Sequence, residues 1–155
     1  MHPNAELIER FYAAFARRDS APMRAAYHQD ARFDDPAFVG LNGSEIGDMW
    51  AMLVARGKDL EITASGIEAD DSRGKAHWEA RYTFSATGRK VHNIIDASFE
   101  FKDGKIYRHR DHFSFWRWSR QALGLPGLLL GWSPLLAKKV QATAKKNLEA
   151  WRARS

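Results

Sequence analysis

The hydrophobic periodicity of the chain changes once, near residue 59, and this change constrains the fold more than any other feature of the sequence. Before it, apolar residues recur every three to four positions, as in residues 7–15, which is typical of amphipathic helices. After it, apolar and polar residues alternate, as in residues 78–84, which is typical of half-buried strands. Helices followed by strands predict an α+β domain in which the helices pack on the concave face of a curved antiparallel sheet.

Three helices are expected in the first half of the chain, each with a residue that favours a helix start. The first begins near Asn4, the second near Asp19 and the third near Ser44, all of which are good N-cap residues. Between the second and the third lies a short extended piece that ends in Asp-Asp-Pro. Pro36 disfavours helical geometry at Asp35, so this aspartate should lie in a loop.

Four strands are expected after residue 59, and they are followed by a last helix near the end of the chain. The strands cover residues 60–65, 77–84, 92–101 and 106–118. The Lys-Asp-Gly sequence at residues 102–104 predicts a tight hairpin between the last two strands.

A chain of 155 residues has the length of one ordinary domain. We divide it into a domain of residues 1–118 and a basic, aromatic helical extension of residues 119–155, which is not an independent domain. The net charge of +5 is concentrated at the C-terminal end, because residues 105–155 carry 11 Lys and Arg against two Asp and Glu. Any electrostatic partner would therefore contact this part of the chain.

Three interpretations of the C-terminal region stay open. In the favoured one, it is a structural extension whose apolar residues, including residues 128–130 and Trp132, close the open end of the domain or pack on a partner subunit. In the second, the tryptophans and lysine pairs attach the protein peripherally to an anionic membrane surface. Nucleic-acid binding is the least supported, because only the charge favours it. The apolar run 123–136 is too short and too broken by Gly and Pro to span a bilayer.

The absence of cysteine excludes disulfides, thiolate metal ligands and a cysteine nucleophile. The His, Asp and Glu residues show no typical metal-ligand spacing, so we expect neither a metal nor another cofactor. Charged residues interrupt the first apolar stretch, which is unlike a signal peptide, and a cytoplasmic location is expected.

Four short segments, in this order and spacing, carry a resemblance to a known family. They are IERFYAAFARRD, YHQDARFDDP, TGRKVHNIIDASFEF and DGKIYRHRDHF, and the resemblance covers residues 5–118. The chain resembles the SnoaL-like domains of the nuclear-transport-factor-2-like superfamily, which includes ketosteroid isomerases, limonene-epoxide hydrolases and polyketide cyclases. The resemblance implies a cone in which a curved sheet and helices enclose a pocket that is open at one end.

The resemblance also implies which side chains line that pocket, and the alternation along the strands agrees with it. Most of them are apolar or aromatic, which suits a small hydrophobic ligand. The expected ligand-contacting residues are Tyr12, Phe33, Trp50, Trp78, Tyr82, Asn93 and Phe113.

Asp35 aligns with the catalytic base of the ketosteroid isomerases, and burial among aromatic residues should raise the pKa of its carboxyl toward neutrality. An equally weighted alternative is that Asp35 only forms an Asx-type turn before Pro36. The two other functional positions of the isomerases hold Phe11 and Ala97, which cannot donate hydrogen bonds to a dienolate. Steroid isomerisation by that mechanism is therefore not expected.

His109 and Asp111 lie two positions apart, so their side chains share one face of the last strand. Asp111 aligns with a catalytic aspartate of the limonene-epoxide hydrolases, but the rest of that triad falls on Trp78 and Ala80, which leaves it incomplete. In a functional interpretation, His109 takes a proton while Asp111 or Asp35 stabilises the cation. In the alternative, His109 and Asp111 form a buried polar pair that is satisfied within the structure.

The sequence therefore predicts a SnoaL-like domain that binds a small hydrophobic molecule. Asp35, His109 and Asp111 would serve as catalytic residues of a cofactor-free isomerase, cyclase or epoxide hydrolase, and the alternative is a non-catalytic binding or assembly domain. The opposite sheet face carries charges of both signs, including His77 and Glu79, which is typical of a symmetric sheet-to-sheet dimer or of a solvated surface. Of the two, we expect a homodimer.

Overall fold

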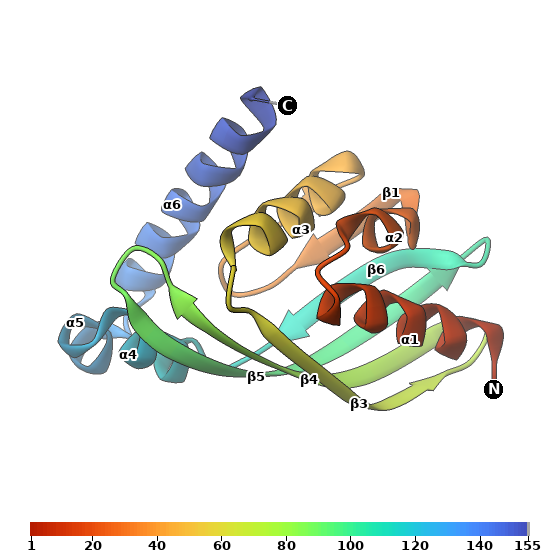
Figure 1. Cartoon of the computed structure of the whole chain (residues 1–155), viewed down its shortest axis with the longest axis horizontal. Coiled ribbons are helices and arrows are strands. Elements are labelled where there is room, and N and C mark those ends of the chain that lie inside the picture. Colours follow the sequence, from red (N-terminus) through yellow and green to blue (C-terminus); the bar gives the residue numbers. More distant parts are fainter. Residues whose placement is uncertain (155) are drawn as a thin grey trace.

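The computed structural model describes residues 1–154 and confirms the α+β class, with a curved, unclosed sheet and helices on its concave side (Figure 1). The six strands are β1 (Tyr27–Asp34), β2 (Leu41–Asn42), β3 (Glu61–Ala69), β4 (Arg73–Phe84), β5 (Arg89–Lys102) and β6 (Lys105–His112). The helices are α1 (Pro3–Ala16), α2 (Ser20–Ala25), α3 (Ser44–Arg56), α4 (Phe115–Leu123), α5 (Leu125–Leu130) and α6 (Pro134–Ala153). The order of the strands in the sheet is β2-β1-β6-β5-β4-β3.

One strand pairing differs from the expected antiparallel sheet. β1 runs parallel to β6, with Phe33 opposite His109, whereas the other neighbouring strands are antiparallel. A long connection through α3 and four further strands separates β1 from β6, and such a crossover permits parallel pairing. The ends of β1 and β6 therefore lie together, which brings the loop that contains Asp35 toward Asp111.

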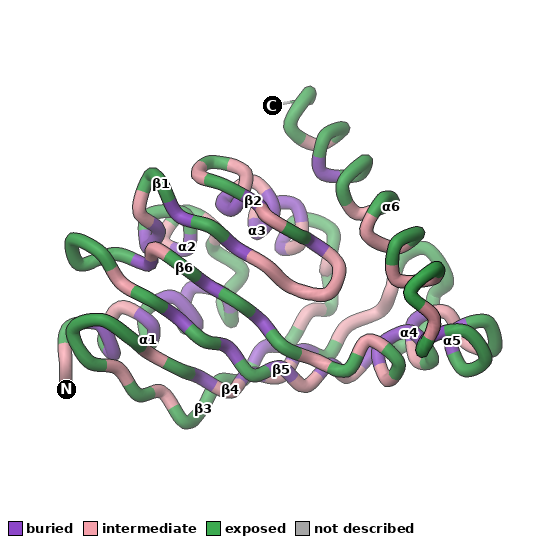
Figure 2. Tube along the Cα trace, turned by 180° about the vertical axis from the view of Figure 1, so that it is seen from behind, coloured by how far each residue is buried: buried purple, intermediate pink, exposed green. Residues whose placement is uncertain are grey.

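The alternation of buried and exposed residues is confirmed along β5 and β6 (Figure 2), whereas in β3 only Ile62 is buried. On β6, for example, His109 and Asp111 are buried. Arg108, which precedes them, and Arg110, which lies between them, are exposed. The hairpin between β5 and β6 is also confirmed. Its Asp103 and the following glycine both have positive φ angles, 55° and 74°, as a two-residue hairpin turn requires.

Helix α1 begins slightly earlier than its sequence signal suggested. The imidazole Nδ1 of His2 accepts the hydrogen bond that caps the helix, from the backbone N–H of Asn4 at 3.0 Å. Asn4 is buried instead, and its amide donates to the carbonyl of Asp70 at 3.0 Å, which ties α1 to the turn between β3 and β4. Asp19 caps α2 as predicted.

The last strand ends at His112, so the prediction that it continues to residue 118 is wrong. The side chain of Ser114 accepts a hydrogen bond from the backbone N–H of Arg117 and starts α4. On this helix Trp118 is buried against Val91 and donates to the hydroxyl of Tyr82 at 2.9 Å. The division into residues 1–118 and 119–155 stays a prediction, and residue 118 itself lies inside α4.

Helices α4 and α5 form a short hairpin whose contact surface is made of small residues. A Cβ atom at Gly127 would collide with the backbone of Ser119, and one at Gly131 would collide with the Ser119 hydroxyl. Because glycine occupies the inner face of α5, its leucines point outward, and residues 128–130 and Trp132 are exposed. Within this chain they do not close the end of the domain, and their packing on a partner subunit stays a prediction.

Helix α6 runs back along the domain and packs beside α3 (Figure 1). Its Leu148 is buried in the main core, and Arg152 donates to Asp48 at 2.8 Å. Gln141 also donates to the carbonyl of Pro36 at 3.1 Å. None of the helices in residues 1–154 is long and apolar enough to cross a membrane.

The glycine contact between α4 and α5 can be tested by a single methyl group. We expect Gly127→Ala to lower the free energy of unfolding by about 2 kcal/mol, because the new Cβ meets rigid backbone rather than a movable side chain. Gly47→Ala is the control, since its Cβ meets the exposed side chain of Arg24, and we expect a change within about 1 kcal/mol. Denaturant unfolding measures both, and equal effects would contradict the rigid contact.

Candidate active site

His109 lies at the centre of the aromatic interior, between the sheet and helices α1 and α3. Its side chain is fully buried. The rings of Phe99 and Phe33 have centroids 4.4 Å and 4.9 Å from the imidazole, and those of Phe11 and Trp50 lie at 6.1 Å and 6.3 Å. A polar ring in such surroundings needs hydrogen-bond partners for both nitrogens.

A chain of hydrogen bonds supplies these partners. Trp50 Nε1 donates to the Tyr27 hydroxyl at 3.0 Å, this hydroxyl lies 2.7 Å from His109 Nδ1, and His109 Nε2 lies 2.8 Å from Asp111 Oδ1. Since an indole N–H can only donate, we assign the Tyr27 proton to the bond with Nδ1 and the imidazole proton to Nε2. Both nitrogens of His109 are therefore occupied, and its ring holds Asp111 rather than facing a ligand.

Asp111 is held by two donors. Trp78 Nε1 donates to Oδ1 at 3.3 Å, in addition to the bond from His109. Both bonds end on the same oxygen, so neither occupies Oδ2. The carboxyl is buried in an aromatic interior and is fixed in one orientation, as a proton-transfer group should be.

Tyr12 contributes an unused polar group beside this carboxyl. Its hydroxyl is buried and makes no hydrogen bond to any described residue. Burial raises the pKa of the phenol well above its usual value, and the charge of Asp111 adds to this effect. Because unpaired buried hydroxyls are rare and costly, this one is a candidate hydrogen-bond donor to a ligand.

Asp35 has both of the properties that the sequence left as alternatives. Its Oδ1 accepts hydrogen bonds from the backbone N–H groups of Ala37 at 2.7 Å and Phe38 at 2.6 Å, which is an Asx-type turn. Burial nevertheless raises the pKa of its carboxyl to about 7, opposed by the Phe38 bond and assisted by the charge of Asp111. The charge of Asp35 in turn contributes to the raised pKa of Tyr82, although burial of that phenol has the larger effect.

The remaining predicted ligand-contacting residues divide into two groups. Trp50 and Phe33 pack around His109, and Trp50 acts on the site through Tyr27. Asn93 is buried on β5, and Phe113 is partly buried against the core. Tyr27 is not among the predicted site residues, because its role depends on the parallel pairing of β1 with β6.

A polar cluster on the convex face of the sheet is separate from this site. His77 bonds to Asp96 and Glu79, each at 3.0 Å, and Glu79 also bonds to His92 at 2.6 Å. The bond to Asp96, followed by that to Glu79, raises the pKa of His77. Within residues 1–154, no three His, Asp or Glu side chains are grouped so that they could hold a metal ion.

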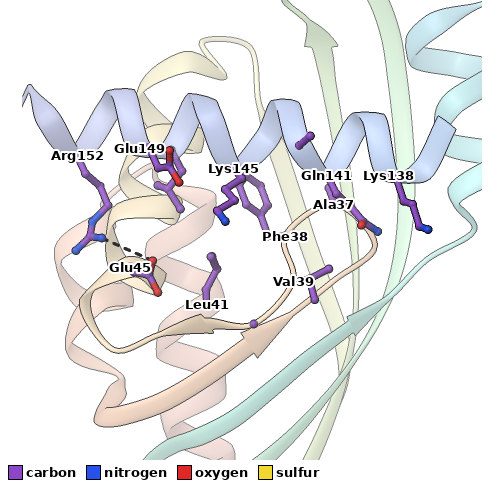
Figure 3. A pocket seen from close by; sticks show the side chains of 13 residues that line it. Ala37, Phe38, Val39, Leu41, Glu45, Lys138, Gln141, Lys145, Glu149 and Arg152 are labelled. Atoms are coloured by element: carbon purple, nitrogen blue, oxygen red, sulfur yellow. Dashed lines mark ion pairs between the residues drawn. The ribbon is translucent and has the colours of Figure 1, made fainter. Parts of the chain in front are cut away.

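Two surface cavities lie away from the polar interior. A groove of about 470 Å³ separates α6 from the loop after β1, and Figure 3 shows side chains such as Gln141 and Val39 on its two sides. A second cavity of about 420 Å³ lies between α1 and α2. Neither is lined by Asp35, His109 or Asp111, so the central ligand pocket stays a prediction.

The family model of the SnoaL-like domain matches residues 8–109. The chain belongs to the SnoaL-like domain family. The matched region begins in α1 and ends at His109, so it includes the loop of Asp35 and nearly the whole polar interior. No protein of curated function matches the sequence.

Solved structures with the same fold come from several bacterial proteins. An LEH-like epoxide hydrolase of M. tuberculosis is 20% identical with a TM-score of 0.65, and the match covers 83% of this chain and 96% of that one. A protein of ketosteroid isomerase-like fold from Catenulispora acidiphila, in complex with trimethylamine, is 15% identical with a TM-score of 0.67, over 79% and 95% of the two chains. A SnoaL-like polyketide cyclase from a Jannaschia species is 13% identical with a TM-score of 0.68, over 80% and 93%. Because these identities are low, the similarity shows only that this SnoaL-like domain shares their fold.

Removing the Tyr27 hydroxyl should break the hydrogen-bond chain of the SnoaL-like domain in its middle. We expect Tyr27→Phe to reduce the free energy of unfolding by about 1–3 kcal/mol, because His109 Nδ1 and Trp50 Nε1 both lose a buried partner. Tyr107→Phe on β6 also removes a phenolic oxygen, but this ring lies beside the cations of Lys102 and Arg108. The free energy of unfolding should therefore change very little. Urea unfolding of the two variants measures the difference, and equal losses would contradict this role of Tyr27.

The raised pKa of Asp35 makes stability depend on pH. The folded protein holds this proton up to about pH 7, whereas an ordinary Asp releases it near 3.8, so the stabilisation is lost as the pH rises through this window. We expect Asp35→Asn, which keeps the oxygen that accepts from Ala37 and Phe38, to remove this pH-dependent loss.

Asp34 provides a control of opposite sign. Partial burial raises its pKa, but hydrogen bonds from Arg32 and Gly40 outweigh this effect and lower it overall. In the wild type, the ionised Asp34 therefore stabilises the fold, and this contribution is lost on acidification below about pH 3.8. Asp34→Asn should lack this contribution at every pH. Unfolding free energies of the three proteins between pH 2 and pH 8 test both signs, because the effect of Asp34 lies below about pH 3.8 and that of Asp35 above it. Parallel curves for wild type and Asp35→Asn would refute the raised pKa.

Proposed function

We propose that this SnoaL-like domain binds a small hydrophobic molecule and transforms it by acid–base chemistry that needs no cofactor. The single observation that supports the proposal most is the asymmetry of its two carboxyl groups, since Asp111 is buried and Asp35 is half-buried in the loop after β1. Asp111 is fixed by two N–H donors, while Asp35 has a pKa of about 7 and can hold or release a proton near neutrality. A pair of titratable groups in different environments is the usual basis for assigning an acid and a base.

In the proposed mechanism Asp111 is the base and Asp35 is the acid. The Oδ2 oxygen of Asp111 takes a proton from a carbon acid or from a water molecule. Asp35 gives its proton to the oxygen on which negative charge develops, and the unpaired hydroxyl of Tyr12 donates a hydrogen bond to the same oxygen. Proton return from Asp111 to Asp35, directly or through the product, restores the starting state. Isomerisation, cyclisation and epoxide opening all fit this scheme.

His109 serves as a positioning residue in this mechanism, not as the proton acceptor that the sequence suggested. Both of its nitrogens are bonded within the protein, and the ring is fully buried. Its function is to orient Asp111 and to supply a hydrogen bond to Oδ1, which leaves Oδ2 for the reaction. The same division between an orienting and a reacting group occurs in other acid–base sites.

A binding module without catalysis is the second candidate, and one observation favours it. The space around His109 is filled by aromatic rings, and the two cavities described above lie at the surface. A ligand of such a module would still meet the Tyr12 hydroxyl. Both candidates therefore bind a ligand. Only the enzyme converts it, and this turnover would require Asp111.

The test uses purified wild type and Asp111→Asn with limonene epoxide, styrene oxide and a small β,γ-unsaturated ketone. We expect turnover of at least one compound by the wild type, and a loss of about 100-fold or more in Asp111→Asn. The variant keeps an oxygen that can accept from His109 and Trp78, so it should remain folded. Wild-type activity should fall as the pH rises through about 7, since Asp35 must be protonated to act as the acid.

The controls separate the two candidates. A thermal shift with these compounds, equal in wild type and Asp111→Asn and without turnover in either, would favour the binding module. Undiminished turnover in the variant would exclude Asp111 as the base.

A further inference from the structure

An exposed apolar surface surrounds α5 at one end of the molecule. Seven of the nine large hydrophobic side chains that are exposed within residues 1–154 lie between residues 116 and 135. Six of them form what we call the apolar patch, and their exposed fractions run from 46% to 78%: Leu125, Leu128, Leu129, Leu130, Trp132 and Leu135. Figure 2 shows α5 as the outermost element at this end, beside the start of α6. Exposed apolar groups at such density mark interaction surfaces in soluble proteins.

The local structure holds these leucines outward. The inner face of α5 is formed by Gly127 and Gly131, which approach Ser119 so closely that no side chain fits between the helices. The leucines of this short helix therefore have no inward position available. Their exposure is a fixed property of the α4–α5 hairpin, and it is not an effect of a loose segment.

The polar backbone of α5 is satisfied without water at its C-terminal turn. The indole N–H groups of Trp116 and Trp132 donate to the carbonyls of Leu128 at 3.1 Å and Leu129 at 2.8 Å. The carbonyl of Leu130 accepts from the backbone N–H of Ser133, also at 2.8 Å. Transfer of this turn into an apolar medium therefore does not leave these carbonyls without a partner, which is the main cost of inserting a short helix into lipid.

The charges around the patch have one sign. Residues 112–148 contain six Lys and Arg and no Asp or Glu. Arg120 lies over the ring of Trp116, 4.6 Å from its centroid, and Lys139 follows Leu135 by four positions, which places both on one side of α6. A second copy of the chain docked on this patch would bring like charges together, which disfavours a symmetric dimer here.

We propose that the apolar patch docks the protein onto an anionic lipid bilayer. The leucines enter the boundary between headgroups and acyl chains, the tryptophans lie at the level of the headgroups, and Arg120 and Lys139 contact anionic headgroups. The contact is peripheral and reversible. It does not depend on the proposed acid–base function, because no residue of the polar interior takes part.

Co-sedimentation with vesicles tests the proposal on the full-length protein. We expect wild type to pellet with vesicles of phosphatidylcholine and phosphatidylserine at low salt, and much less with phosphatidylcholine alone or at high salt. In Leu128→Glu/Leu129→Glu the partition coefficient should fall about 100-fold, since two inserting side chains become charged. These side chains are exposed, so the melting temperature should not change. Val39→Glu introduces the same residue at an exposed apolar site outside the patch, and should bind as wild type does.

The electrostatic part is tested separately. Arg120→Gln and Lys139→Gln should each lower the partition coefficient on anionic vesicles about fivefold, with little change on neutral ones. Lys105→Gln, at the β5–β6 hairpin on the opposite end of the molecule in Figure 1, is the matched control and should have no effect.

Three results would overturn the proposal. The first is no pelleting with anionic vesicles at low salt. The second is equal binding by wild type and Leu128→Glu/Leu129→Glu. The third is light scattering that shows an oligomer which the double variant dissolves, together with absent vesicle binding, since the patch would then be an interface between copies.

Discussion

The parallel pairing of β1 with β6 is the constraint on which the polar interior depends. It sets Phe33 opposite His109, places the hydroxyl of Tyr27 on Nδ1 of that ring, and leads the chain from β1 into the loop of Asp35. A slip of one residue would turn Tyr27 and Phe33 to the other face of the sheet. The two carboxyl groups could not influence one another without this pairing, because they are far apart in the sequence and belong to different strands and loops.

The aromatic surroundings determine how the polar groups divide their roles. Since an unpaired nitrogen is costly in such an interior, His109 uses both nitrogens for internal hydrogen bonds and is lost as a ligand-facing base. The same burial raises the pKa of Asp35, which has only backbone N–H groups to oppose it. For this reason the proposed mechanism assigns proton transfer to two aspartates with different environments and not to the histidine, the residue type usually expected to carry it.

The sequence was sufficient to predict the fold class, the hairpin at residues 102–104 and the inward face of each strand, because periodicity and turn residues are local signals. It could not predict the partner of β1, since strand pairing across a long crossover leaves no local pattern. Tyr27 was missed for this reason, and the roles of Asp35 stayed divided because an Asx turn and a raised pKa have the same sequence signature. Trp118 was placed on a strand because alternating aromatic residues resemble one, and only the cap at Ser114 starts the helix.

Helix α6 connects the apolar patch with the loop that holds Asp35. It begins directly after the patch, and its Gln141 bonds to the carbonyl of Pro36, the residue next to Asp35. The groove in Figure 3 separates part of this helix from the loop, while Leu148 of α6 and Phe38 of the loop both belong to the main core. A displacement of α5 would therefore reach the loop through α6. Because burial raises the pKa of Asp35, a shift of this loop would change how readily the carboxyl holds its proton, and α6 is the element through which the proposed docking would reach the proposed chemistry.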